Sequence, residues 1–281
     1  MNKSNKSAIG NRQSAMITGR DNSLLRQARA VREGKHESLI FVEGLRLCEE
    51  ALRSGLEIHA VIYSNEIAQK ERAAALVAEL GKVCERLGEV SESLLATVSY
   101  TKTPQGMIVL AGRPVSGKAR LATTKAQPHL LVIMDGINNP VNVGAITRSA
   151  EAAGATGVIT TGDSSDPFSP KTLRGAMGSA FRLPIWNRAS YQEAIAWCAE
   201  QKIKTVCTDI RATKLHTEVD WNGPIALILG SESTGLAAEQ VEMATTDVKI
   251  PMHGSVESLN VGVAAAVILY EAARQRMCNS G

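Results

Sequence analysis

The chain has 281 residues, of which 44% are apolar and 21% are charged, and this length predicts about two globular domains with sizeable cores. No apolar run approaches the ~20 residues that a membrane span needs, and the N-terminus is rich in Asn, Lys and Ser where a signal peptide would be apolar. We therefore expect a soluble, cytoplasmic protein with no membrane partner. The five cysteines are an odd set without a C-x-x-C pair, which indicates neither a disulfide framework nor a zinc site.

Lysine and arginine are concentrated at the start of the chain. The first 35 residues hold eight of them against two acidic residues, so the other 246 residues carry a net charge of −3. A basic segment on a slightly acidic body suggests a polyanion such as nucleic acid, because phosphate contacts by Lys and Arg release counterions. The alternative is a solvated tail. Aromatic residues make up only 4% of the chain, which argues against a platform that stacks the bases of single strands.

Residues 1–22 lack hydrophobic periodicity and are predicted to be a basic, disordered arm. From residue 23 onward, strands and helices alternate, which predicts a small α/β domain over residues 23–112. Ser23 is the expected N-cap of its first helix. The expected helices cover residues 24–33, 45–54, 66–80 and 92–97, and the expected strands cover residues 39–42, 59–63 and 107–110.

A polar and basic stretch, residues 113–128, is predicted to link this domain to a second one. The sequence from Gly112 to Ala119, at the start of this stretch, nearly matches the phosphate-binding pattern G-x-x-x-x-G-K-[ST]. Ala119 has no hydroxyl to place on magnesium, however, and no long apolar helix follows. We therefore predict no nucleoside triphosphate site there.

Residues 129–281 are predicted to form a three-layer α/β/α domain around a parallel sheet. No G-x-G-x-x-G follows its first strand, so an ordinary dinucleotide site is not indicated. The last helix is apolar all round, which predicts burial on more than one side, within the chain or at a subunit interface. The expected strands cover residues 130–134, 157–161, 204–207, 225–229 and 247–250, and the expected helices cover residues 141–153, 191–200 and 258–276.

Polar clusters follow three of these strands, and ligands of open α/β sheets bind at such carboxyl ends. The first cluster, residues 135–148, contains Asn142 and Arg148. The second, residues 230–236, places Glu232 just after a buried strand. As local structure alone, each of these two clusters can be a helix cap or a tight turn.

The third cluster, residues 250–262, is the most informative. Ser258 is the expected N-cap of the last helix, which puts Asn260 one turn inside an otherwise apolar helix. An unpaired buried amide costs about 1–3 kcal/mol, so Asn260 is expected to have a partner. His253 has no second metal ligand nearby, so we interpret it as a loop histidine and predict no metal site.

Together the three clusters resemble the ordered motifs of the SpoU branch of the SPOUT RNA methyltransferases. They span residues 138–270, in the family's order. The preceding region resembles the family's small ribosomal-protein-like RNA-binding domain, through the sequence FVEG at residues 41–44 and the alternating elements. The matching patterns are Asn142-x-Gly144-x-x-x-Arg148, Gly230-x-Glu232-x-x-Gly235-Leu236 and Ile250-Pro-Met-x-Gly254-x-x-x-Ser258-Leu259-Asn260-Val261.

The resemblance implies a ribose 2'-O-methyltransferase that uses S-adenosylmethionine, with a deep trefoil knot in the C-terminal domain and a site at a homodimer interface. It also implies structured RNA as substrate. A separate N-terminal domain favours large-subunit ribosomal RNA over transfer RNA by family analogy. The polar catalytic set then falls on Asn142, Arg148, Glu232, Ser258 and Asn260. The cofactor cradle, largely backbone, falls on Leu229, Gly230, Ile250, Met252 and Leu259.

Two alternatives stay open: an RNA-binding assembly factor that keeps the fold without activity, and an α/β enzyme that acts on a small molecule. The intact polar set counts against the first.

Methyl transfer to a hydroxyl needs alignment and a proton acceptor. A guanidinium holds its proton too tightly to be a good base, which makes Arg148 a poor proton acceptor. We therefore expect Arg148 to bind the neighbouring phosphate through two parallel hydrogen bonds and to orient the hydroxyl, while the phosphate or a water takes the proton. In this scheme Glu232 and Asn142 fix the loops, and Ser258 and Asn260 shape the pocket.

Overall fold

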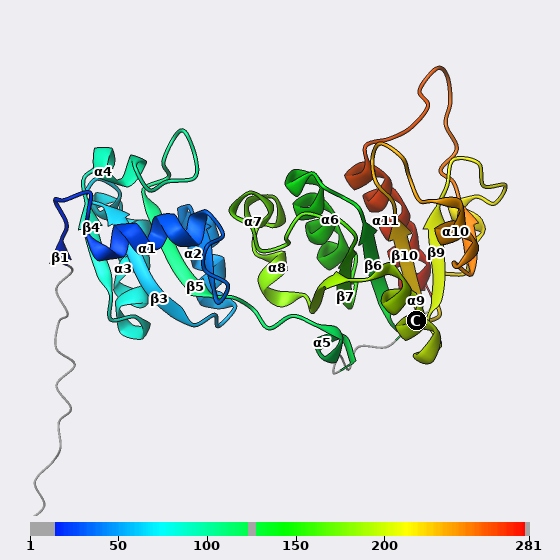
Figure 1. Cartoon of the computed structure of the whole chain (residues 1–281), viewed down its shortest axis with the longest axis horizontal. Helices are drawn as coiled ribbons and strands as arrows, with labels where there is room; N and C mark the ends of the chain where they lie inside the picture. Colours follow the sequence, from blue (N-terminus) through cyan, green and yellow to red (C-terminus); the bar gives the residue numbers. More distant parts are fainter. Residues whose placement is uncertain (1–14, 123–127, 279–281) are drawn as a thin grey trace, which may run out of the picture. The chain divides into compact units, whose positions relative to one another are not determined.

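The structure is a computed structural model that describes residues 15–122 and 128–278. The chain divides into two compact units, residues 1–112 and 113–281, and each unit has its own sheet (Figure 1). Residues 1–14 of the predicted basic arm lie outside the described residues.

The N-terminal unit has a five-stranded mixed sheet in the order β1-β4-β3-β5-β2, in which β5 runs antiparallel to both of its neighbours. Apolar side chains of α1, α4 and the sheet form its core. The strands are β1 (Ala15–Met16), β2 (Leu39–Glu43), β3 (Ile58–Ser64), β4 (Leu87–Val90) and β5 (Met107–Gly112). The helices are α1 (Ser23–Arg32), α2 (Leu45–Arg53), α3 (Glu71–Val83) and α4 (Glu92–Ala96), with a 3-10 turn η1 (Ile67–Gln69).

Three predictions for this unit need correction. Residues 15–22 belong to the fold and not to a disordered arm, because β1 pairs with β4 and Ile17 is buried against Gly88. A Cβ atom at Gly88 would lie 2.5 Å from the Ile17 side chain, so the glycine makes room for it. Asn22, one residue earlier than predicted, caps α1. The predicted helix over residues 66–80 is divided into η1 and α3 because the residue between them is extended.

The C-terminal unit has a parallel six-stranded sheet in the order β11-β9-β10-β6-β7-β8. Side chains of α5, α9 and α10 pack on one face, and α6 packs with α7 and α11 on the other, which confirms the α/β/α prediction (Figure 1). The strands are β6 (Leu130–Asp135), β7 (Gly157–Thr161), β8 (Ile185–Ala189), β9 (Lys204–Thr208), β10 (Ile225–Leu229) and β11 (Thr246–Val248). The helices are α5 (Lys118–Ala122), α6 (Pro140–Ala152), α7 (Pro170–Ala176), α8 (Ser179–Arg182), α9 (Tyr191–Glu200), α10 (Ala238–Glu242) and α11 (Val261–Cys278), with a 3-10 turn η2 (His216–Glu218).

The predicted linker, residues 113–128, is partly structured. It contains α5, whose Leu121 is fully buried in the core beneath α9, so this stretch belongs to the second unit. A helix of five residues is too short to show a hydrophobic period, which is why the sequence pattern did not reveal it. The segment between β7 and α9 also holds α7, α8 and β8, which were not predicted.

The last helix, α11, begins at Val261, and residues 249–260 form a loop that projects from the unit (Figure 1). Three side chains of α11, those of Val263, Val267 and Tyr270, are exposed in the single chain. The prediction that this helix is buried on more than one side within one chain is therefore wrong, and burial at a subunit interface stays a prediction. No helix within the described residues combines the length and the apolar character that crossing a membrane requires.

The close packing of α6 on α7 depends on Gly144. A Cβ atom there would lie 2.5 Å from the carbonyl oxygen of Thr172 and 2.9 Å from the Cα atom of Gly175, and these backbone atoms cannot rotate away. We expect Gly144→Ala to lower the free energy of unfolding by about 1–3 kcal/mol in urea denaturation, although alanine is the better helix former. Gly223→Ala is the matched control, because its added methyl meets no atom within 4 Å. An equal loss in both variants would contradict this packing argument.

Candidate active site

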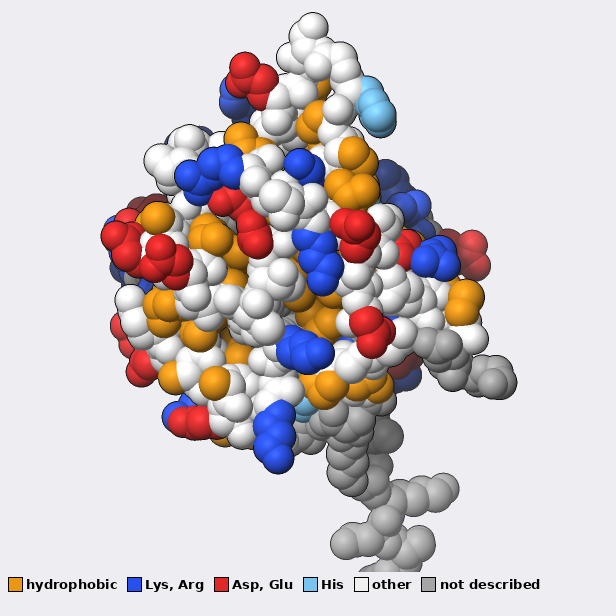
Figure 2. Space-filling view, turned by 90° about the vertical axis from the view of Figure 1, so that its right-hand side faces the viewer, with side chains coloured by type: hydrophobic (Ala, Val, Ile, Leu, Met, Phe, Trp, Pro, Cys, Tyr) orange, Lys and Arg blue, Asp and Glu red, His pale blue; other side chains and the backbone are white. Residues whose placement is uncertain are grey.

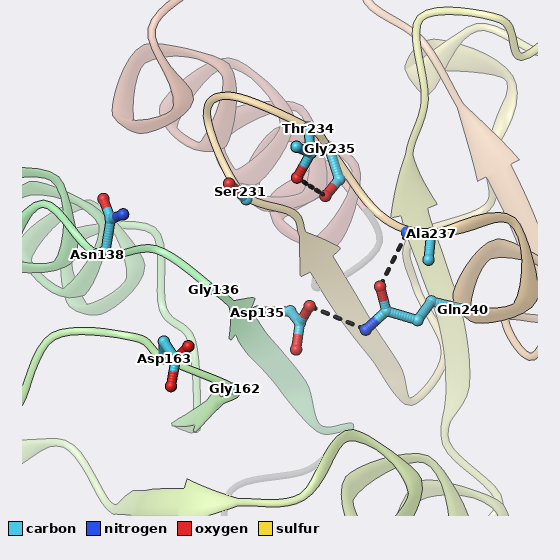
Figure 3. Close-up of a pocket in the computed structure, with 10 residues that line it drawn as sticks. All are labelled: Asp135, Gly136, Asn138, Gly162, Asp163, Ser231, Thr234, Gly235, Ala237 and Gln240. Carbon is cyan, nitrogen blue, oxygen red and sulfur yellow. Dashed lines mark hydrogen bonds between the residues drawn. The ribbon is translucent and has the colours of Figure 1, made fainter.

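The parallel strands of the C-terminal unit end at one edge of the sheet, where ligands of such sheets bind. A cavity of about 410 Å³ lies there among the loops that follow β6, β7 and β10 (Figure 3). The polar side chains that line it are those of Asp135, Asn138, Asp163, Ser231, Thr234 and Gln240.

Asp135, the last residue of β6, forms hydrogen bonds to two neighbouring elements that border this cavity. One carboxylate oxygen accepts a hydrogen bond from the Thr161 hydroxyl at 2.6 Å. The other accepts from the side-chain amide of Gln240 at 2.9 Å (Figure 3). The Gln240 oxygen in turn accepts from the backbone amide of Ala237 at 2.9 Å. The predicted site residues did not include Asp135 or Gln240. The place of Asp135 in the first polar cluster was a signal, but nothing pointed to a partner 105 residues away.

Asn142 brings the three motifs together. Asn139 caps α6 and Pro140 begins it, which places Asn142 in the first turn, where it is 6% exposed. Its Nδ2 donates to the carboxylate of Glu232, and its Oδ1 accepts from Nδ2 of Asn260 at 3.2 Å. The structure therefore joins one residue from each motif, and we call Asn142, Glu232 and Asn260 the motif cluster.

Asn260 caps the last helix and does not lie inside it as predicted. Its Oδ1 accepts from the backbone amides of Gly262 at 2.9 Å and Val263 at 3.3 Å, while its Nδ2 is left to donate to Asn142. Asn260 is exposed, and it nevertheless has the partner that was expected. Ser258 is thus not the cap, because the chain at residues 249–260 is a loop.

The loop after β10 closes tightly on itself. A Cβ atom at Gly230 would lie 2.6 Å from the carbonyl carbon of Gly235 and 2.7 Å from the amide nitrogen of Leu236, so only glycine fits. The Gly235 amide donates to the Ser231 carbonyl at 2.9 Å and completes the turn. This turn places Glu232 where it meets Asn142.

Arg148 and Ser258 do not join the motif cluster. Arg148 lies on α6, is exposed, and makes no hydrogen bond or ion pair with the residues that the structure describes. Ser258 is exposed in the loop at residues 249–260 and also has no such partner among the described residues. The structure therefore connects three of the five predicted catalytic residues and leaves the other two accessible.

The predicted cofactor residues lie on two loops of this edge. Leu229 ends β10 and is fully buried, and Gly230 follows it. Ile250 and Met252 are half-buried and Leu259 is 36% exposed, all three in the loop between β11 and α11. These side chains leave apolar surface uncovered, which suits a ligand with an apolar body.

Two ionisable side chains near this edge, Cys207 and Tyr191, are made poorer nucleophiles by burial. Burial raises the pKa of the Cys207 thiol to about 12, helped by the carboxylates of Asp247 and Asp209. Burial also raises the pKa of Tyr191, whose hydroxyl donates to the backbone oxygen of Gln240 at 2.8 Å. Among the described residues, no group of three or more His, Cys, Asp or Glu side chains could hold a metal ion.

Comparison with known proteins shows similarity over both units. Residues 129–270 match the SpoU rRNA Methylase family, and residues 22–109 match the MRM3-like substrate binding domain. An uncharacterized tRNA/rRNA methyltransferase of Synechocystis sp. is 32% identical over 271 residues, which cover 95% of this chain and 96% of that protein. The 23S rRNA (guanosine(2553)-2'-O)-methyltransferase RlmP of Bacillus subtilis is 30% identical over 241 residues, covering 85% of this chain and 90% of that protein.

The crystal structure of an AdoMet-bound rRNA methyltransferase from Sinorhizobium meliloti has a similar fold. It matches with a TM-score of 0.79 at 29% identity, over 93% of this chain and 98% of that one. The similarity thus extends over both units and almost the whole chain. This chain belongs to the SpoU rRNA methylase family.

Proposed function

We propose that this chain transfers a methyl group from S-adenosylmethionine to a ribose 2'-hydroxyl of large-subunit ribosomal RNA. The observation that carries the proposal is the double hydrogen bonding of Asn142, which joins the loop after β10 to the start of α11. The bound AdoMet of the Sinorhizobium meliloti relative supports the cofactor, and the 23S rRNA 2'-O-methylation named for the Bacillus subtilis relative supports the substrate.

The residues at the carboxyl edge fit S-adenosylmethionine, which supplies a methyl group already activated by a sulfonium. Leu229, Gly230, Ile250, Met252 and Leu259 would hold it. Gly230 admits no side chain because the backbone of Gly235 and Leu236 packs against it, so at this position only backbone atoms could contact the ligand. All five residues are uncharged, which suits a positive charge that disappears in the reaction and so must not be held too tightly in the ground state.

The chain's own polar residues align the hydroxyl. Arg148 has no partner among the described residues, so its guanidinium is available for two hydrogen bonds to the phosphate beside the target ribose. A guanidinium is a poor base, so the phosphate or a water takes the hydroxyl proton. Asn142 holds the two loops together through Glu232 and Asn260. Ser258, in the loop at residues 249–260, would contact the bound substrate or cofactor.

Two measurements on the full-length protein separate this function from its alternatives. Calorimetry with S-adenosylmethionine should show binding, and radioactive methyl from it should enter large-subunit ribosomal RNA. Binding without transfer would favour an inactive RNA-binding assembly factor. If the protein shows no cofactor binding and no methyl transfer, an α/β enzyme that acts on a small molecule is favoured. If only transfer RNA is methylated, the substrate is transfer RNA and not ribosomal RNA.

We also propose that the protein is a homodimer whose second copy completes the site. The packed helices α6 and α11 both leave apolar side chains exposed: Val141 at 47%, Val263 at 49%, Val267 at 38% and Tyr270 at 55%. Arg148 lies seven residues after Val141, two turns along the same face of α6. A partner on this face would therefore border Arg148.

Val267→Arg is expected to convert the dimer to a monomer in sedimentation velocity, because an unpaired charge would be buried at the interface. Turnover should fall with the loss of the dimer. Val115→Arg is the matched control, since Val115 is 75% exposed in the same unit and lies outside these helices. Wild-type protein that sediments as a monomer at micromolar concentration would contradict the proposal.

The trefoil knot and the cytoplasmic location stay proposals. The connection from β11 to α11 supports the knot. The strand β11 lies at one edge of the sheet beside β9, whereas α11 packs on α6. Residues 249–260 therefore cross the carboxyl ends of the strands between them.

A ribosomal RNA substrate supports the cytoplasmic location. On the face that Figure 2 displays, basic and acidic side chains are interspersed.

A further inference from the structure

A buried carboxylate in the N-terminal unit directs its hydrogen bonds to one loop. Glu43 ends β2 and is only 5% exposed. Its carboxylate accepts from the Tyr100 backbone amide at 2.9 Å, from the Thr101 hydroxyl at 2.8 Å and from the Ser99 hydroxyl. A carboxylate is unfavourable in an apolar interior without such donors, so the loop and Glu43 stabilise each other.

Other contacts fix the same loop at both ends. The Arg32 Nη1 of α1 donates to the carbonyl oxygens of Val98 at 3.0 Å and Ser99 at 3.1 Å. At the far end, Gly44 adopts φ 101° and lies against the side chain of Gln105, where a Cβ atom would clash. Residues 99–105, which we call the Glu43 loop, are therefore anchored near both ends and project between α4 and β5 (Figure 1).

The Glu43 loop exposes an aromatic ring and a lysine. Of the three aromatic residues in this unit, Phe41 and Tyr63 are buried, whereas Tyr100 is 42% exposed. The side chains of Tyr100 and Lys102 make no hydrogen bond or ion pair with the described part of the chain. A rigid loop that leaves a ring exposed binds a partner with little ordering cost.

We propose that the Glu43 loop is a preorganised RNA contact, in which Tyr100 stacks on one unpaired base and Lys102 binds the adjacent phosphate. This inference rests on the proposed function. Proteins that read RNA by sequence do so mostly at unpaired bases splayed onto aromatic rings. One ring fits a single flipped-out nucleotide of a structured RNA, whereas a single-strand platform needs several rings. Glu43 acts as a positioning residue that holds the backbone of Tyr100.

The test is binding of full-length variants to a transcript of large-subunit ribosomal RNA. Tyr100→Ala should weaken binding about 5- to 150-fold, the range for loss of one base stack, and Tyr100→Phe should stay within about twofold of wild type. Lys102→Ala should lower the slope of log affinity against log salt by about one. Val83→Ala is the matched control, a 58% exposed apolar residue of the same unit, and should change nothing. Affinity for S-adenosylmethionine should be the same in all variants.

A tryptophan at the same position reports stacking directly. The chain's three Trp residues all lie in the C-terminal unit, so the fluorescence that Tyr100→Trp adds should be quenched by the RNA. In the double variant Glu43→Gln with Tyr100→Trp, the RNA should quench the added fluorescence less. Thermal unfolding should show that this double variant is still folded. Wild-type protein that fails to bind the transcript overturns the proposed function and this inference with it. Wild-type binding with unchanged affinity in Tyr100→Ala, or with unquenched Tyr100→Trp, overturns the loop inference alone.

Discussion

Replacing Arg148 by lysine is expected to reduce kcat of methyl transfer at least about tenfold, while binding of S-adenosylmethionine stays unchanged. Lysine keeps the charge, and so part of the RNA affinity, but it cannot make the two parallel hydrogen bonds that a guanidinium makes to a phosphate. We expect the main effect on kcat because the substitution disturbs the orientation of the ribose more than it lowers the affinity for RNA. Arg148→Ala should lose RNA affinity as well as turnover.

The control for this substitution lies nearby in the same unit. Arg182 forms an ion pair with Glu151 of α6, with Nε at 2.6 Å from Oε1, and the side chain of Arg182 is 39% exposed. Arg182→Lys makes the same chemical change without touching the motif cluster, so its kcat should equal that of wild type. Near-normal single-turnover rates for Arg148→Lys would exclude the phosphate-binding role.

Replacing Asn142 by aspartate should damage both stability and activity more than any other single change in the motif cluster. Asn142 is 6% exposed and donates to the Glu232 carboxylate, so the substitution removes a donor and brings two carboxylates together. We expect the free energy of unfolding to fall by about 1–3 kcal/mol, because the hydrogen bond is lost and a carboxylate stands at the buried position 142 beside that of Glu232. Cofactor affinity and turnover should fall with it, since the loop after β10 loses its attachment to α6.

The damage in Asn142→Asp should depend on pH. Each carboxylate raises the pKa of the other, so lowering the pH places one proton between them and restores a donor. The activity of the variant relative to wild type should therefore rise as the pH falls. Asn139→Asp is the matched control: Asn139 caps α6, where aspartate serves equally well, so it should stay near wild type at every pH. A flat ratio of Asn142→Asp to wild-type activity across pH would argue against the contact with Glu232.

Long and regular elements of the fold were predictable from the sequence. The strands β7 and β10 and the helix α9 have the predicted bounds, because a continuous apolar run and a helical period are visible over their lengths. The strand β4 and the helices α5 and α8 were missed; elements of four or five residues show little periodicity, although α4, which has five residues, was predicted. The start of α11 was misplaced because apolar residues continue across its boundary and hide the cap at Asn260.

The sequence predicted the site residues that belong to the three motifs, but not the contacts between them. The motif patterns singled out Asn142, Glu232 and Asn260, but their mutual contact depends on how α6, β10 and α11 pack. Contacts such as Gln240 with Asp135 join residues far apart in the chain. Single hydrogen bonds of this kind leave no periodic signal in a sequence, so they emerge only from the three-dimensional structure.

The most direct test is the chemical position of the transferred methyl group. Large-subunit ribosomal RNA without its modifications is incubated with the full-length protein and S-adenosylmethionine, and the product is digested to nucleosides and mapped at nucleotide resolution. The account predicts methylation of a ribose 2'-oxygen at a defined nucleotide, absent with Arg148→Ala. A methyl group on a base, or no methyl group on an RNA that the protein binds together with the cofactor, would contradict it.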